Sequence, residues 1–260
     1  MYSIEELQRS LNTQDFGRKL FVYDSIDSTN ACAKELANKG IPEGAVIIAD
    51  YQRAGRGRMG RKWDGEAGNS LLFSVIIRPI FDNNKIGLLP LFAAASVALV
   101  IEAITGLRCE CKWPNDILLN GRKCCGILME SAFQHNLLNY VIIGIGLNVN
   151  QKIFDEKLAG KATSLSRECN KEFDRKDIFQ RVMMSLESLY ADVKTGDFNT
   201  TLRLWKSHAA IFGKQISLMQ ADKEINGCAI DLADDGGLLV ETITGPEVFY
   251  AGDVTIIKHN

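Results

Sequence analysis

Histidine is scarce in this chain, and several common catalytic signatures are missing. Only three histidines occur, and none has the spacing of a metal site or of a catalytic pair. The sequence has no G-x-x-x-x-G-K-[ST] phosphate loop, no G-x-S-x-G nucleophile elbow and no H-E-x-x-H zinc motif. A nucleotide, if one binds, therefore needs a cradle of another kind.

The chain also lacks a charge excess, an apolar leader and a membrane-length apolar run. Its 30 basic and 32 acidic residues nearly cancel, which argues against bulk binding to nucleic acid or anionic membranes. The N-terminal residues contain no apolar signal core, so the seven cysteines are expected as free thiols in the cytoplasm. The run 88–104 contains Pro90, Ser96 and Glu102 and is shorter than the roughly 20 residues of a membrane span, so it predicts a buried helix.

Strand and helix patterns alternate through most of the chain. We expect strands at 21–24, 45–50, 71–78, 109–113, 117–119 and 139–149, and helices at 28–38, 88–104, 174–195 and 202–206. The dipeptide Asn120-Gly121 is a strong signal for a two-residue hairpin. After Gly213, four or five short strands separated by turn residues predict a small barrel.

The most informative segment is the loop from Gln52 to Trp63. It carries five basic residues in ten positions, with no acidic residue: Arg53, Arg56, Arg58, Arg61 and Lys62. It matches G-x-G-x-x-G formally, but the residues that follow are a poor start for a helix, so a Rossmann loop is not indicated. Forked arginine donors and close-approaching glycines favour a loop that closes over a phosphate-bearing ligand. A solvated basic loop and a nucleic-acid contact remain alternatives.

The pentapeptide Lys112-Trp113-Pro114-Asn115-Asp116 presents a cation, an indole, an amide and a carboxylate in succession. Proline fixes its own φ angle and restricts Trp113, so the segment is held stiffly. Asp116 could hold Mg²⁺ against a triphosphate, because magnesium prefers one or two carboxylates together with phosphate oxygens. The alternative interpretation is a plain turn.

Lys123 begins the return strand of the predicted hairpin, seven residues after Asp116. Strand alternation predicts that it shares a face with Cys125, Ile127 and Met129. A lysine on that apolar face is either at the fraying end of the strand or functional.

Gly144 and Gly146 interrupt the apolar strand that ends at Asn148. Glycines inside a strand mark close approach, here either by a ligand or by tightly packed protein.

Taken in order, these segments resemble the biotin–protein ligase family. The resemblance rests on Asp27-Ser28-Thr29-Asn30, the Gln52 loop with GRGRMGRKW, KWPND, GRKCCGIL and GIGLNVN, and it extends more loosely to DDGGLLVE and Gly252-Asp253-Val254. It implies an α+β fold: a catalytic domain at 1–212 with a central mixed β-sheet and flanking helices, and a small SH3-like β-barrel at 213–260. It also implies that ATP activates biotin as biotinyl-5′-AMP, with Mg²⁺, and that the biotin passes to a lysine of a biotin carboxyl carrier protein.

The resemblance also implies roles for individual residues. Those implied for biotin are Ser28, Thr29, Asn30, Gln52, Arg56 and Lys123. Those implied for ATP are Arg56, Arg58, Arg61, Trp63, Lys112, Asn115 and Asn148. Catalysis would rest on Lys123, Arg58 and Asp116, and Asp116 is also the candidate Mg²⁺ ligand. Whether Asp116 or a cluster of cations helps to deprotonate the acceptor lysine stays open.

Two departures and several alternatives accompany this interpretation. Met59 stands where family members often carry a second basic residue. Fewer than 25 residues precede the first motif, so a DNA-binding repressor role is not expected. The charge balance and the short apolar run likewise predict no membrane partner. A lipoate or octanoate ligase or transferase shares the fold, but the Ser28, Thr29 and Gln52 set favours biotin. The net charge argues against a nucleic-acid-binding module. Lys123, Asp116 and the three loop arginines argue against a catalytically idle biotin-binding scaffold. A homodimer through sheet edges stays open.

Overall fold

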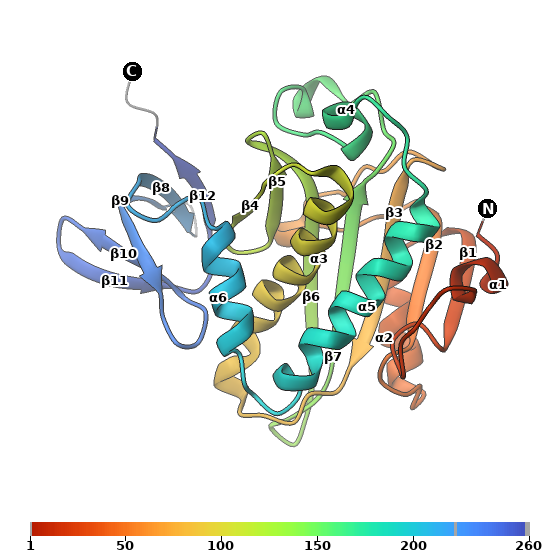
Figure 1. The fold of residues 1–260 in the computed structure, drawn as a ribbon. Helices are drawn as coiled ribbons and strands as arrows, with labels where there is room; N and C mark the ends of the chain where they lie inside the picture. The colour runs from red at the N-terminus through yellow and green to blue at the C-terminus, as the bar shows by residue number, and fades with distance from the viewer. Residues whose placement is uncertain (1, 221–222, 258–260) are drawn as a thin grey trace.

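The computed structural model describes residues 2–220 and 223–257, which form two β-sheets and six α-helices among them (Figure 1). The larger sheet has seven strands in the order β1-β2-β3-β7-β6-β5-β4. Strands β1 and β2 run parallel and all other neighbours antiparallel, so the predicted mixed sheet is confirmed. Its strands are β1 (Leu20–Ile26), β2 (Val46–Gln52), β3 (Ser70–Ile77), β4 (Cys109–Lys112), β5 (Asp116–Leu119), β6 (Arg122–Gln134) and β7 (Leu137–Asn148).

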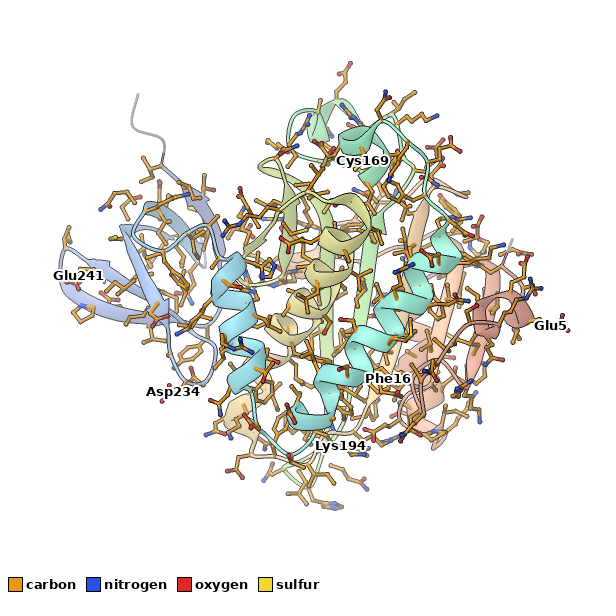
Figure 2. The ribbon with its side chains drawn as sticks, in the orientation of Figure 1. Glu5, Phe16, Cys169, Lys194, Asp234 and Glu241 are labelled. Carbon is orange, nitrogen blue, oxygen red and sulfur yellow. The ribbon has the colours of Figure 1, made fainter. Side chains whose placement is uncertain are left out.

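Helices cover both faces of this sheet. One face packs against α3 (Leu89–Thr105), α5 (Arg175–Val193) and α6 (Asn199–His208), which lie in front of it in Figure 1, and α2 (Thr29–Asn38) packs on the other. The short helix α1 (Ile4–Gln8) rests on α5, and α4 (Leu165–Cys169) follows the loop after β7. Phe16, labelled in Figure 2, packs on Tyr190 of α5 with 5.2 Å between the ring centroids.

Helix α3 is the predicted buried helix. Together with the 3-10 turn before it (Asn83–Leu88), it is the one segment of the described chain that is long and apolar enough to cross a membrane. Its side chains from Leu89 to Ala98 are almost all buried against the sheet and α5, as expected of a core helix. The helix ends at Gly106, whose φ of 71° is the left-handed C-cap that glycine adopts readily.

Local sequence signals account for the other boundaries. The side chain of Ser28 accepts a hydrogen bond from the backbone N–H of Ala31 and so caps α2, and Asp174 caps α5 in the same way. Asn120 and Gly121 have φ angles of 50° and 71° and connect β5 to β6, which confirms the predicted hairpin.

The prediction that Lys123 shares a face of its strand with Cys125, Ile127 and Met129 is wrong. The pairing of β5 with β6 shifts register, since Ile117 lies opposite Cys125 but Leu118 lies opposite Lys123. The extra residue, Cys124, forms a β-bulge, and a bulge reverses the alternation of the strand before it. Lys123 is therefore turned away from the α3 core, and an ideal Cβ on Gly126 would lie 3.1 Å from its Nζ.

The C-terminal strands form a separate antiparallel sheet in the order β11-β10-β9-β8-β12. They are β8 (Gln215–Gln220), β9 (Lys223–Leu232), β10 (Leu238–Thr242), β11 (Gly245–Phe249) and β12 (Asp253–Ile256). The indole Nε1 of Trp113 donates to the carbonyl of Gly236 at 3.0 Å, so the aromatic residue of KWPND contacts the turn between β9 and β10. The predicted domain boundary between residues 212 and 213 lies between α6 and β8. This boundary and the closure of the C-terminal strands into an SH3-like barrel both stay predictions.

Candidate active site

The floor of the candidate site is one row of residues across four strands. Lys112, Asp116, Gly126 and Gly146 are successive partners on β4, β5, β6 and β7, and partners in register share a face of a sheet. The two glycines leave that face open. A Cβ would lie 2.7 Å from the Trp63 ring at Gly126 and 2.5 Å from it at Gly146. The glycines therefore allow the indole to lie directly on the backbone.

A cluster of charges surrounds this floor. Lys123 Nζ lies 2.7 Å from Asp116 Oδ1 and 5.5 Å from the centre of the Trp63 ring. Lys112 is partly buried on the neighbouring strand. Burial lowers the pKa of Lys112, Asp116 opposes that shift, and the positive charge of Lys123 adds to it. The cluster therefore holds more positive than negative charge in a partly desolvated place.

Arg58 enters this cluster from the loop between Gln52 and Trp63, here called the arginine–glycine loop. Its Nη1 donates to Asn115 Oδ1 at 3.1 Å, and Asn115 Nδ2 donates to the carbonyl of Ile127 at 2.6 Å. Burial lowers the pKa of Arg58, and the nearby charge of Asp116 opposes that shift. Asn115 thus ties the loop to β6.

The arginine–glycine loop folds back on itself as a small hairpin. Gly57 donates its N–H to the Arg61 carbonyl at 2.7 Å, and Trp63 donates to Gly55 at 3.0 Å. At the tip Met59 is exposed and has a φ of 53°. Arg61 pairs with Asp253, which links the loop to the C-terminal sheet. Loop residues 56–61 line a cavity of about 530 Å³ together with Leu128 and Glu130.

The residues expected at the biotin ureido ring gather at the start of α2. Gln52 Oε1 accepts from the backbone N–H of Thr29 at 2.8 Å and lies 3.1 Å from its hydroxyl. Asn30 Nδ2 donates to Glu130 Oε2 at 2.8 Å. Ser28, Thr29 and Asn30 are all buried, whereas Arg56 is exposed at the cavity.

Asn148 lies at the end of β7. Its Nδ2 donates to the carbonyl of Thr163 at 3.0 Å, while its buried Oδ1 has no partner among the described residues. The buried indole Nε1 of Trp63 also has none there. A buried polar atom without a partner is costly, so both atoms are suited to a polar ligand.

Three residues of the site escaped the sequence interpretation. Ser74 touches both Thr29 and Asn30, Glu130 fixes the Asn30 amide, and Gly126 completes the floor. A serine inside the apolar strand LLFSVII and a glycine inside CCGILM were available as signals. Nothing in the sequence pattern singled out Glu130.

Asp116 is the one candidate magnesium ligand. No group of three or more histidine, cysteine, aspartate or glutamate side chains suited to a metal occurs among residues 2–220 and 223–257. A single carboxylate still fits Mg²⁺ that is bound mainly by phosphate oxygens and water. Asp116 therefore fits as one ligand of a metal carried by a nucleotide.

Fold and site together define a class of enzymes that join a carboxylic acid to a protein. Residues 22–148 match the Biotin/lipoate A/B protein ligase family, and residues 211–256 match the Biotin protein ligase C terminal domain. The chain belongs to this family, and within it to the biotin–protein ligases. The predicted family and fold class are thereby confirmed.

Curated relatives and solved structures agree with this assignment. The chain is 38% identical over 256 residues to the Bifunctional ligase/repressor BirA of Bacillus subtilis, covering 98% of this chain and 79% of that protein. It is 32% identical over 267 residues to the Biotin--[acetyl-CoA-carboxylase] ligase of Mycobacterium tuberculosis, covering 96% of both. The biotin protein ligase from Aquifex aeolicus in complex with biotin and ATP superimposes with a TM-score of 0.79 at 29% identity, over 93% of this chain and 100% of that one.

Proposed function

We propose that the chain activates biotin with ATP and transfers it to a lysine of a biotin carboxyl carrier domain in the cytoplasm. One observation carries the chemistry: Lys123, Lys112 and Arg58 gather around Asp116 beside a glycine floor. A cationic, partly desolvated surface of this kind suits a reaction between two anions. The seven cysteines are all free, in keeping with a reducing compartment.

In the first half-reaction a carboxylate oxygen of biotin attacks the α-phosphorus of ATP, and pyrophosphate leaves. The obstacle is electrostatic, because an anion must approach a polyanion. Lys123 and Arg58 would stabilise the charge on the carboxylate and the α-phosphate, and Lys112 would lie nearby. Mg²⁺ would offset part of the triphosphate charge, with Asp116 as its one protein ligand.

Nucleotide and biotin would occupy neighbouring parts of the sheet. Trp63 would turn its indole Nε1, and Asn148 its Oδ1, towards the nucleotide, since both atoms are buried without a partner among the described residues. Thr29, Asn30 and Gln52 would hold the ureido ring, and Arg56 would close over the ligand from the loop. Arg61 would reach the phosphates by leaving Asp253.

In the second half-reaction the acceptor amine attacks the mixed anhydride, and AMP leaves. The amine must be neutral, although a free lysine has a pKa of about 10.4. Burial already lowers the pKa of Lys112, with a further contribution from Lys123. The same surroundings would lower the pKa of an incoming amine. Asp116 is a weaker candidate for a base, because its Oδ1 is paired with Lys123.

The test is adenylate formation without an acceptor. The protein is incubated with ATP, Mg²⁺ and either biotin, lipoate or octanoate, and the products are identified by mass spectrometry. Biotinyl-AMP from biotin alone is the expected result. An adenylate from lipoate or octanoate but not from biotin would move the chain to the lipoate branch of the family, and no adenylate from any acid would refute the proposal.

A further inference from the structure

Beyond the end of β7, a short segment of the loop that follows it takes its place beside β6. The pairing of β6 with β7 begins at Cys125, so Lys123 lies outside it and forms a parallel bridge with Ala162 instead. Lys123 donates its backbone N–H to the Lys161 carbonyl at 2.8 Å, and its own carbonyl accepts from the Thr163 N–H at 2.9 Å. The backbone of Lys123 is therefore held on this side by the loop segment.

Thr163 also joins this lysine to Asn148. The Thr163 carbonyl accepts from Asn148 Nδ2 at 3.0 Å, while its N–H bonds to Lys123. Asn148 is the residue whose buried Oδ1 has no partner among the described residues and was assigned to the nucleotide above. Thr163 itself is fully buried. A displacement of this one threonine would therefore disturb two residues of the proposed nucleotide site.

The side chain of Thr163 is held by Glu168 of α4, the short helix above the sheet in Figure 1. The Thr163 hydroxyl donates to Glu168 Oε1, which also accepts from Arg122 Nη2 at 2.7 Å. The other carboxylate oxygen accepts from Asn120 Nδ2 at 2.7 Å. Asn120 and Arg122 belong to the β5–β6 hairpin turn that precedes Lys123, so one carboxylate holds both the loop segment and the hairpin.

Glu168 makes these bonds away from solvent, since its side chain is only 4% exposed. Burial works to raise the pKa of Glu168, but its three donors outweigh that effect and hold the pKa below its usual value. Hydrogen bonds to a charged group are stronger than neutral ones. If the carboxylate were removed, Asn120 and Arg122 could turn to water, because both reach the surface. The buried Thr163 hydroxyl would lose its acceptor, which is costly.

We propose that Glu168 is a positioning residue that keeps Lys123 and Asn148 in place through Thr163 and the β5–β6 hairpin. The inference rests on the proposed function, because it takes Lys123 to meet the α-phosphate and Asn148 to meet the base of the nucleotide. Glu168 needs no contact with a ligand, since both of its oxygens already accept from the protein.

The test is a double-mutant cycle on adenylate formation. Single-turnover rates of biotinyl-AMP formation at saturating ATP and biotin are measured for the wild type, Glu168→Ala, Lys123→Ala and the double variant. Glu168→Ala should slow the reaction about tenfold, the size of one hydrogen bond to a charged group. When Lys123→Ala is already present, it should cost no more than about twofold, because a residue that acts through Lys123 has nothing left to position. The same loss in both backgrounds would show a general structural role and would overturn the inference.

The KM for ATP tests the connection to Asn148 in the same way. Glu168→Ala should raise this KM about fivefold in the wild-type background, the size of a neutral hydrogen bond, and by less than about twofold when Asn148→Ala is already present. An equal rise in both backgrounds would show that Glu168 does not act through Asn148 and would overturn that half of the proposal.

Two control variants separate positioning from charge and from stability. Glu168→Gln keeps an accepting oxygen for Thr163 and Arg122, and the exposed amide of Asn120 can turn over to accept from the new amide nitrogen, so the rate should stay within about threefold. A loss equal to that of Glu168→Ala would overturn the positioning role. Glu187→Ala removes another carboxylate that accepts three N–H donors, on α5, and should leave the rate within about twofold.

Thr163→Val provides a milder test that keeps the inference open to refutation even if Glu168→Ala does not fold. This variant removes only the hydroxyl that donates to Glu168 and should slow adenylate formation about threefold, with the same dependence on Lys123. A wild-type rate in Thr163→Val would overturn the inference alone. No biotinyl-AMP from the wild-type protein would overturn the proposed function and the inference with it.

Discussion

Replacing Lys123 by alanine is the sharpest test of the cationic site. The variant removes an ammonium group that lies 2.7 Å from Asp116 Oδ1 beside the glycine floor. It also leaves the Asp116 carboxylate without this partner, so a negative charge would face two anionic substrates. The backbone pairing of Lys123 with Lys161 and Thr163 does not use the side chain, so the fold should persist.

The expected loss can be worked out from charge and exposure. Two unit charges about 4 Å apart attract by about 4 kcal/mol at an effective dielectric constant near 20. The Lys123 side chain is 34% exposed, so solvent screening reduces this figure to about 2–3 kcal/mol. A loss of that size lowers the rate of biotinyl-AMP formation about 30- to 150-fold. The free energy of unfolding should fall by only about 1 kcal/mol, because the ion pair is partly exposed.

Single-turnover formation of biotinyl-AMP at saturating ATP and biotin measures this loss, and thermal unfolding checks the fold. Lys123→Arg keeps the charge but must fit a larger group beside Trp63, so an intermediate rate is expected. Lys152→Ala removes an exposed lysine paired with Glu172 and serves as the matched control. A Lys123→Ala rate within about threefold of wild type would refute the electrostatic argument.

Three further predictions concern the glycine floor of the site, the loss of stability at acid pH and the contact that holds the C-terminal sheet. Gly146→Ala places a Cβ 2.5 Å from the Trp63 ring, so the indole must move, and the KM for ATP measured by steady-state kinetics should rise about tenfold. Burial works to raise the pKa of Glu187, but three backbone N–H donors hold that pKa below its usual value. The stabilisation is therefore complete above the unfolded pKa and is lost as pH falls through the lowered folded pKa. Glu187→Gln should lower the free energy of unfolding by about 1 kcal/mol at neutral pH, and denaturant titrations should show the difference shrinking below about pH 4.5. Trp113→Phe removes the hydrogen bond to Gly236 and should cost about 1–3 kcal/mol, measured by thermal unfolding; no loss would mean that the indole does not help to hold the C-terminal sheet.

Much of this protein is fixed by local sequence. Ser28 and Asp174 cap their helices, Gly106 ends α3, and Asn120-Gly121 closes the hairpin, because each of these effects depends on a few neighbouring residues. The arginine–glycine loop, KWPND and the strand glycines could likewise be found as motifs, since their residue types and order suffice to indicate the chemistry.

Tertiary structure decided where those groups point and what supports them. The bulge at Cys124 depends on how β5 pairs with β6, and it alone turns Lys123 towards the floor. Ser74 on β3 and Glu130 on β6 both bond to the side chain of Asn30 at the start of α2, although all three lie far apart in sequence. Trp113 bonds to Gly236, in the turn between β9 and β10, 123 residues later in the chain. Such contacts join residues far apart in sequence, and strand register and packing set them rather than any local pattern.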